Sequence, residues 1–376
     1  MTAVTEPRDV LATDPATAHR ATFAGADAVA AGLVVATTTT TFADRRWADE
    51  VTASLGAGER AVVALPFEHG GTAVAHRVRP EADSADVADV PPPAPSAHAA
   101  TPEPSEAAYA ARVTAALGLI AAGDLRKVVL GRWVDVVSDP PLDPRAVVAR
   151  LLDRRPGRYV FGVPLTADAA GPVLLGASPE LLVRRTGDVV TCFPLAGSVP
   201  RSADEREDAR RAAGLGRSAK DLAEHAFVVD AITAALAPVC VEVDVPARPV
   251  VVSTDTLHHL GTPVRARLAP GTTGWSALHL ALLLHPTPAV GGVPTTAALD
   301  AIAALEPGPR GPLAGAVGWV DAAGDGEFAV TIRAGVLDGP TLRLFAGAGI
   351  VAGSDPAAEV RETGAKLATM MTAVGP

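Results

Sequence analysis

The chain has 376 residues, 48% of them hydrophobic and 4% aromatic, which is enough for one large domain or two average domains with a sizeable core. Its net charge of −10 and pI near 5.4 argue against a nucleic acid or an anionic membrane as partner, because neither would meet a basic surface. With 2 cysteines and no C-x-x-C pair, neither a disulfide framework nor a structural zinc site is indicated. No signal-peptide or membrane-spanning pattern is found, so we expect a cytoplasmic protein. The acidic charge favours a small ligand, and we expect a monomer.

Composition divides the chain into three parts. Residues 1–78 contain short apolar runs and no chemical motif, and we interpret them as a scaffold part of the domain. Residues 79–106 are rich in Pro, Ala, Ser, Asp and Glu, so they are predicted to form a mobile loop or linker that cannot bury enough apolar surface to order itself. The catalytic part is expected over residues 107–376.

A helix and a strand open this catalytic part. Helical spacing over residues 109–122 ends at Gly123, and alternation predicts a strand over residues 127–136. Lys127 shares a strand face with Val129 and Trp133, an apolar setting that would partly desolvate its amine. A strand-end lysine that reaches water is the alternative, and the pattern leaves both interpretations open.

The next two segments carry a carboxylate and a glycine. Glu180 lies between apolar runs, where burial would raise its pKa as a general acid requires, although a turn glutamate in solvent would fit as well. Residues 193–201, FPLAGSVPR, are predicted to form a Gly/Ser turn suited to backbone contact with a ligand.

A predicted helix, Ala219–Leu236, is capped by Ser218 and carries Glu224 near its start, where the helix dipole favours an acidic group even without a ligand. Residues 283–294, LLHPTPAVGGVP, are too apolar for a surface loop and are expected to line a pocket. The histidines lack the compact spacing of a zinc site, so we expect no His-bound transition metal.

The C-terminal residues 318–366 combine strand and helix signals. Runs at 327–334 and 341–345 flank an Asp-Gly-Pro turn and predict a hairpin whose first strand ends in Arg333. A glycine-rich turn at 346–349 follows, and then a helix capped by Ser354 or Asp355. Glu359, Glu362 and Lys366 share one face of that helix.

Two carboxylates, next to glycines that have no side chain and to an arginine, could hold a hard cation together with an anionic small molecule. An exposed charge ladder is the alternative that spacing alone allows. Gly347, Gly349 and Ala352 also fit a relaxed dinucleotide fingerprint. Too few residues follow to complete the βαβ unit, so a nucleotide-binding oxidoreductase is only a distant alternative.

Seven segments in series resemble the chorismate-utilising enzymes, and most closely the siderophore-type isochorismate synthases. They are KVVLGR, GASPELLVRR, PLAGS, SAKDLAEH, LHPTPAVGG, VGWVDAAGDGEFAVTIR and AGAGIVAGSDPAAEVRETGAKL. The resemblance covers roughly residues 109–372 and implies a single large α+β domain with antiparallel β-sheets packed together and helices around them. It also implies Mg²⁺ and the substrate chorismate, a dianion.

The resemblance assigns roles by matching motif to motif. It implies that Lys127 is the general base and Glu180 the general acid, and that Glu224 and Glu362 bind magnesium with Glu359 close behind. The residues that it implies for substrate binding are Gly197, Ala289, Ile332, Arg333, Gly347 and Lys366.

Two positions discriminate within the family. Anthranilate synthases have Gln where this chain has Lys127, and aminodeoxychorismate synthases have Lys where it has Ala196, so water is the expected nucleophile. Leu313 and Val290 depart from residues common in isochorismate synthases. Salicylate synthases, which go on to expel pyruvate, share the active-site set and are the main alternative. A non-catalytic binding protein is disfavoured because the catalytic and metal positions are filled.

Overall fold

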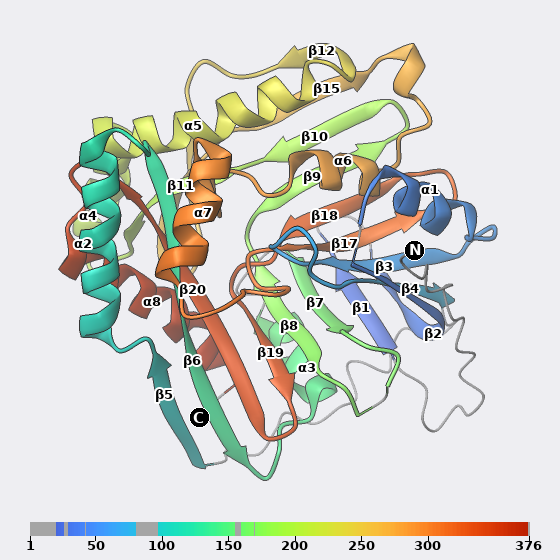
Figure 1. Ribbon diagram of the computed structural model, residues 1–376, viewed down its shortest axis with the longest axis horizontal. Coiled ribbons are helices and arrows are strands. Elements are labelled where there is room, and N and C mark those ends of the chain that lie inside the picture. Colours follow the sequence, from blue (N-terminus) through green and yellow to red (C-terminus); the bar gives the residue numbers. More distant parts are fainter. Residues whose placement is uncertain are drawn as a thin grey trace, which may run out of the picture.

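The computed structural model describes residues 20–25, 29–41, 43–79, 97–154, 159–168 and 170–374 (Figure 1). The helices are α1 (Arg45–Ala53), α2 (Glu106–Ala122), α3 (Pro144–Arg154), α4 (Glu205–Leu215), α5 (Ala219–Leu236), α6 (Ala277–Leu284), α7 (Thr295–Leu305) and α8 (Pro356–Val374). The strands are β1 (Arg20–Ala24), β2 (Val29–Thr40), β3 (Arg60–Leu65), β4 (Ala73–Arg79), β5 (Ala97–Glu103), β6 (Lys127–Asp139), β7 (Tyr159–Pro164), β8 (Val173–Ser178), β9 (Leu181–Thr186), β10 (Val189–Phe193), β11 (Leu195–Pro200), β12 (Cys240–Asp244), β13 (Val250–Ser253), β14 (Leu257–Gly261), β15 (Val264–Leu268), β16 (Gly292–Val293), β17 (Ala316–Asp321), β18 (Gly326–Val330), β19 (Ala334–Asp338) and β20 (Thr341–Val351).

Most of the described strands join one antiparallel, 17-stranded sheet. Strand pairing runs β12-β15-β10-β9-β18-β17-β3-β4-β2-β1-β7-β8-β19-β20-β6. The edge of β6 that faces away from β20 pairs with β16 at one end and with β5 at the other. A second, 3-stranded sheet has the order β11-β14-β13. The predicted α+β class with antiparallel sheets is confirmed.

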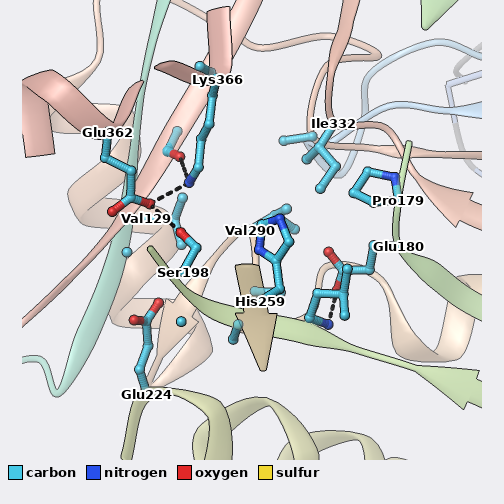
Figure 2. Close-up of a pocket in the computed structure, with 18 of the residues that line it drawn as sticks. Val129, Pro179, Glu180, Ser198, Glu224, His259, Val290, Ile332, Glu362 and Lys366 are labelled. Carbon is cyan, nitrogen blue, oxygen red and sulfur yellow. Dashed lines mark hydrogen bonds and ion pairs between the residues drawn. The ribbon is translucent and has the colours of Figure 1, made fainter. Parts of the chain in front are cut away.

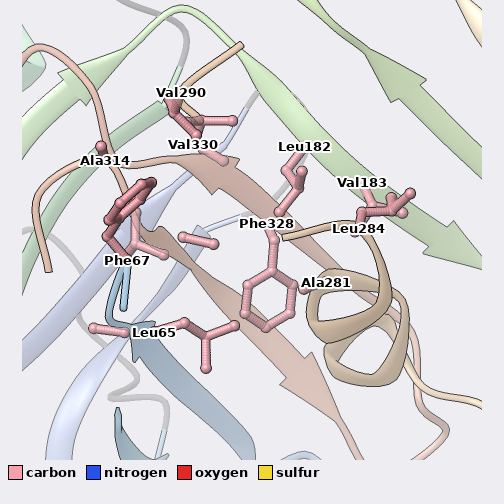
Figure 3. Close-up of a cluster of buried hydrophobic side chains, with 14 of the residues drawn as sticks. Leu65, Phe67, Leu182, Val183, Ala281, Leu284, Val290, Ala314, Phe328 and Val330 are labelled. Carbon is pink, nitrogen blue, oxygen red and sulfur yellow. The ribbon is translucent and has the colours of Figure 1, made fainter. Parts of the chain in front are cut away.

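One large hydrophobic cluster takes side chains from both halves of the long sheet, because the sheet curves and brings β1 and β7 against β3 and β17. Figure 3 shows part of this cluster, where Phe328 of β18 lies near Leu65 of β3 and beside α6. Residues from β1 to β4 belong to the same cluster. The N-terminal part therefore shares the core of the domain and has no separate core among the described residues.

The predicted loop over residues 79–106 is partly wrong. Residues 80–96 lie outside the described residues, but Ala97–Glu103 form β5, which pairs with β6 from Asp139 to Trp133. Strand pairing satisfies backbone N–H and C=O groups through a remote partner, and this does not require an apolar run in the segment itself.

Two predicted turns are strands. The glycine-rich residues 346–349 lie inside β20, which pairs with β6 along its whole length. Residues 195–200 form β11, where a bulge at Gly197, with φ +76°, shifts the register against β14. These glycines do not turn the chain. They keep β20 and β11 free of side chains where other groups approach.

One predicted helix and one predicted turn are confirmed. The predicted helix Ala219–Leu236 is confirmed as α5, with the Oγ of Ser218 accepting the N–H of Asp221. The hairpin forms between β19 and β20 around Gly339, as the turn signal predicts. The first strand predicted for it, over residues 327–334, is wrong. Residues 331–333 interrupt this run, the residues before them belong to β18, which pairs with β17 and β9, and β19 is the strand that pairs with β20. Among the described residues, no helix has both the length and the apolarity that crossing a membrane requires.

Phe328→Ala is expected to lower the free energy of unfolding by about 3–5 kcal/mol, because it leaves a cavity at a side chain with 0% exposure. Equilibrium urea denaturation at fixed pH measures this change. The control is Val250→Ala on β13, whose side chain is 49% exposed and whose loss should change stability by less than about 0.5 kcal/mol. Equal losses in the two variants would contradict the position of the core.

Candidate active site

The structure gathers the residues expected from the resemblance around one cavity. Those that line it are Glu180, Gly197, Glu224, Ala289, Ile332, Arg333, Gly347, Glu359, Glu362 and Lys366. Lys127 is not part of the lining surface. It lies directly behind Glu224 with 1% of its side chain exposed. The cavity lies where β6, β20, α5, α8 and the segment after α6 come together, and Figure 2 shows its interior.

Lys127 and Glu224 form a buried ion pair. Nζ of Lys127 at the start of β6 is 3.1 Å from Oε1 of Glu224 on α5, and the Glu224 side chain is 12% exposed. Gly349 of β20 makes this pair possible, because a Cβ at that position would lie 2.2 Å from Glu224 Oε1 and 3.1 Å from Lys127 Cε. The alternative of a lysine reaching water is wrong, since the amine is enclosed.

Glu180 lies between β8 and β9 with 3% exposure, so the alternative of a turn glutamate in solvent is also wrong. The N–H of Leu195 donates to its Oε1 at 3.2 Å. Burial raises the pKa of Glu180 to about 7, although this N–H and the charges of Lys127 and Arg333 oppose the shift. Figure 2 shows Glu180 and Glu224 on opposite sides of the cavity.

Helix α8 brings two carboxylates to the cavity. Asp355, one of the two predicted cap residues, caps the helix by accepting the N–H of Ala358 at 2.8 Å. Glu362 Oε1 is 2.6 Å from Nζ of Lys366 and accepts the hydroxyl of Ser198 at 3.2 Å. Burial alone would raise the pKa of Glu362, but the charge and hydrogen bond of Lys366 outweigh it, and the pKa is lowered.

Glu359, one turn before Glu362 on α8, is 3% exposed, and Nζ of Lys220 lies 3.6 Å from its Oε1. Burial and the charge of Glu362 raise its pKa. The face formed by Glu359, Glu362 and Lys366 therefore points into the protein, and the alternative of an exposed charge ladder is wrong.

Arg333 has an unusual backbone conformation. Its φ is 51° and that of Ala314 is 61°; both residues line the cavity, and no other non-glycine residue in the described ranges has a positive φ. Such strain persists where the surroundings enforce it, and often at functional sites. Burial lowers the pKa of Arg333 to about 10, so the side chain is still a cation at neutral pH. Nearby, Lys366 donates from Nζ to the carbonyl of Gly347 at 2.8 Å.

A second buried ion pair supports the cavity wall. The side chains of Arg310 and Glu306 are 0% and 1% exposed, and Nε of Arg310 donates to Glu306 Oε2 at 2.8 Å. Arg310 also donates to the carbonyls of Val129 and Val290, each at 2.8 Å, and both of these residues line the cavity. The guanidinium thus ties β6 to the apolar segment after α6, which was predicted to line a pocket.

Sequence reasoning missed four polar residues of the cavity: Ser198, Lys220, Asp221 and His259. His259 on β14 is 6% exposed, projects toward the middle of the cavity, and its Nε2 has no hydrogen-bond partner in the part of the chain that the structure describes (Figure 2). Burial holds its pKa well below the usual range, so it is neutral. Successive side chains of a strand point to opposite faces, so His259 points away from its neighbour His258, which contacts Asp208. This alternation is the one signal in the sequence that separates the two histidines.

The donors fit a hard cation. Glu224, Glu359 and Glu362 offer only carboxylate oxygens, and the amine of a lysine lies next to each one, in a place that another cation could take. No three His, Cys, Asp or Glu side chains converge closely enough to hold a metal by themselves, as far as the described residues extend. This donor set suits Mg²⁺, which takes one or two protein carboxylates and keeps places for water and for substrate oxygens.

An antiparallel α+β domain with buried carboxylates, lysines and an arginine around one cavity is the arrangement of an enzyme that binds a small anion. The family model "Chorismate binding enzyme" matches residues 70–375, so the chain belongs to the chorismate-binding enzyme family.

Among its relatives, the isochorismate synthase DhbC of Bacillus subtilis is 47% identical over 278 residues, covering 73% of this chain and 69% of the relative. The isochorismate synthase EntC of Escherichia coli K12 is 44% identical over 272 residues, covering 72% and 68%. The crystal structure of DhbC from Bacillus anthracis superposes with a TM-score of 0.84 at 38% identity, covering 94% of this chain and 95% of that one.

The raised pKa of Glu180 predicts a pH-dependent stability difference between the wild type and Glu180→Gln. A raised folded-state pKa stabilises the protein below the unfolded value of 4.5, and this contribution is lost as the pH rises through about 7. Relative to Glu180→Gln, the wild type should therefore lose about 3 kcal/mol between pH 4.5 and 8.

Urea denaturation of both proteins across this pH range measures the difference. The exposed Glu242→Gln on β12 controls for removal of a carboxylate from the surface. A difference between the wild type and Glu180→Gln that stays constant with pH would show that Glu180 is not a buried, protonated acid.

Proposed function

We propose that the chain is an isochorismate synthase, an isomerase that converts chorismate reversibly into isochorismate with Mg²⁺. The observation that carries the proposal is the placement of Lys127 and Glu180: the first lies behind Glu224 and the second lies across the same cavity, and both are buried. The relatives named isochorismate synthase, at 44% and 47% identity, support the same activity.

In the proposed reaction the oxygen of a water forms a bond to C2 of the ring, both ring double bonds shift by one position, and the bond from C4 to its hydroxyl breaks. Lys127 takes a proton from the attacking water as the new C–O bond forms. Glu180 gives its proton to the departing hydroxyl, which leaves as water. A pKa of about 7 supports this role, because at neutral pH a large fraction of Glu180 carries the proton that it must donate.

Lys127 can serve as a base only when its amine is free of a proton. Its Nζ lies 3.1 Å from Oε1 of Glu224, so the proposed base is held by the carboxylate that would also hold the metal. The proposal therefore requires the amine to be released from this contact before it accepts a proton.

Glu224 and Glu362 would hold Mg²⁺, with Glu359 close behind. The metal supplies orientation and polarisation of the substrate's oxygens when it is bound. Arg333 and Lys366 would contact the substrate carboxylate, and both are cations on the cavity surface. Gly197, Ala289, Ile332 and Gly347 offer backbone and apolar contacts to the ring.

Water is the proposed nucleophile because Ala196, which is 7% exposed, puts no amine in the cavity. The proposed role extends to supplying isochorismate for siderophore synthesis, through 2,3-dihydroxybenzoate or salicylate. The description of the Bacillus anthracis DhbC structure as 2,3-dihydroxybenzoate-specific supports this extension. The monomeric state and the cytoplasmic location stay predictions.

Incubation of the purified protein with chorismate and Mg²⁺, followed by chromatography, tests the proposal. We expect an equilibrating mixture of chorismate and isochorismate from either starting compound, and no conversion after the metal is removed with EDTA. Salicylate with pyruvate would instead identify a salicylate synthase. Recovery of unchanged chorismate from the metal-loaded protein would refute both activities.

Lys127→Ala is expected to reduce kcat by about 10²–10⁴-fold, because the variant has no group to take the proton from water. Steady-state rates of isochorismate formation measure the loss, and circular dichroism checks the fold. Arg46→Ala on α1, with a side chain that is 86% exposed, is the matched control and should keep the wild-type rate. A fully active Lys127→Ala would refute the assignment of the base.

A further inference from the structure

The chain uses lysine very sparingly. It contains 32 lysine and arginine residues, and only three of them are lysines: Lys127, Lys220 and Lys366. All three belong to the same cavity, since Lys220 and Lys366 line it and Lys127 lies behind its wall at Glu224. At every other position where the chain has one of these two cations, it has arginine. This distribution suggests that an ammonium group is needed at each of the three positions.

Each lysine contacts one glutamate. The distances from Nζ to the carboxylate are 3.1 Å for Lys127, 2.6 Å for Lys366 and 3.6 Å for Lys220. The proposed mechanism uses Lys127 as a base and Lys366 as a substrate contact, but it gives Lys220 no task. Lys220 also has the longest of the three contacts, and within the described residues its Nζ makes no hydrogen bond.

The position of Lys220 is unfavourable for the helix that carries it. It is the second residue of α5, directly after the cap Ser218 and residue 219, in a turn where the helix dipole opposes a positive charge. Its side chain is 41% exposed, compared with 1% for Lys127 and 14% for Lys366. Lys220 is therefore the pocket lysine that an incoming ligand can reach from solvent.

The difference between lysine and arginine explains what this position requires. An arginine at 220 could bind Glu359 through two parallel hydrogen bonds and would hold that carboxylate firmly. An ammonium on a flexible four-carbon stem is a point charge that can move from one carboxylate to another. Its single contact with Glu359, at 3.6 Å, is an interaction that a second anion can replace.

We propose that Lys220 is a substrate-binding residue that exchanges Glu359 for a carboxylate of the incoming dianion on the exposed side of the cavity. This inference rests on the proposed function for the identity of the dianion. It adds a third cation to the contacts expected from Arg333 and Lys366. Glu359 is then freed at the moment when the substrate arrives, beside the position assigned to the metal.

Steady-state kinetics of Lys220→Met and Lys220→Arg test this role. We expect Lys220→Met to raise KM for chorismate about tenfold, the effect of one lost charge-assisted contact, and to change kcat by less than about threefold. Lys220→Arg should not restore KM, because the guanidinium stays on Glu359. Arg217→Met removes an exposed cation just before the same helix, outside the cavity, and should leave both constants unchanged. A wild-type KM in Lys220→Met would overturn the proposal.

Amine labelling gives a readout that does not depend on turnover. With only three lysines, acetylation of the wild-type protein can be followed at each site by peptide mass spectrometry. Lys220 should be acetylated first, and chorismate at ten times its Kd with Mg²⁺ should slow this labelling about tenfold. Labelling of Lys220 that is unaffected by chorismate, in a protein that turns chorismate over, would overturn the inference and leave the proposed function intact. Protection of Lys220 by chorismate in a protein that does not turn chorismate over would support the inference and overturn the proposed function.

Discussion

The candidate active site depends on one buried ion pair, between Lys127 at the start of β6 and Glu224 on α5. Burying two charges is costly, and removing one partner leaves the other charge uncompensated, so the strand and the helix must keep their relative position. The long pairing of β6 with β20 fixes the position of the strand that carries Lys127. Gly349 leaves the space that the pair occupies, because any larger residue there would meet the carboxylate of Glu224.

Two buried glutamates in one cavity differ because their surroundings differ. Glu224 has an ammonium at 3.1 Å, whereas Glu180 has one backbone N–H and more distant cations. Burial therefore dominates at Glu180 and favours its protonated form, while Glu224 is held in an ion pair. The proposed acid thus lies on one side of the cavity, and the ion pair that contains the proposed base lies on the other.

The cavity walls are held by residues that do not line it. Arg310 and Glu306 connect β6 to the segment that carries Val290. Arg132 does the same for α8, since its Nε donates to Thr363 Oγ1 at 3.0 Å and its guanidinium also reaches the carbonyl of Val360 at 3.2 Å. Glu359 and Glu362 are thereby presented to the cavity by a helix that is tied to the strand bearing Lys127.

By itself, the sequence determined the local elements and the family. A cap such as Ser218, a turn at Gly339 and the order of seven motifs are signals carried by neighbouring residues, and the structure has α5 and the turn at Gly339 where these signals place them. Tertiary structure alone decided that residues 346–349 form a strand, that Ala97–Glu103 join the sheet, that Glu180 is buried, and that Lys220 and His259 reach the cavity. The reason is physical: strand pairing, burial and charge contacts depend on partners that are remote in the chain, which a local pattern does not specify.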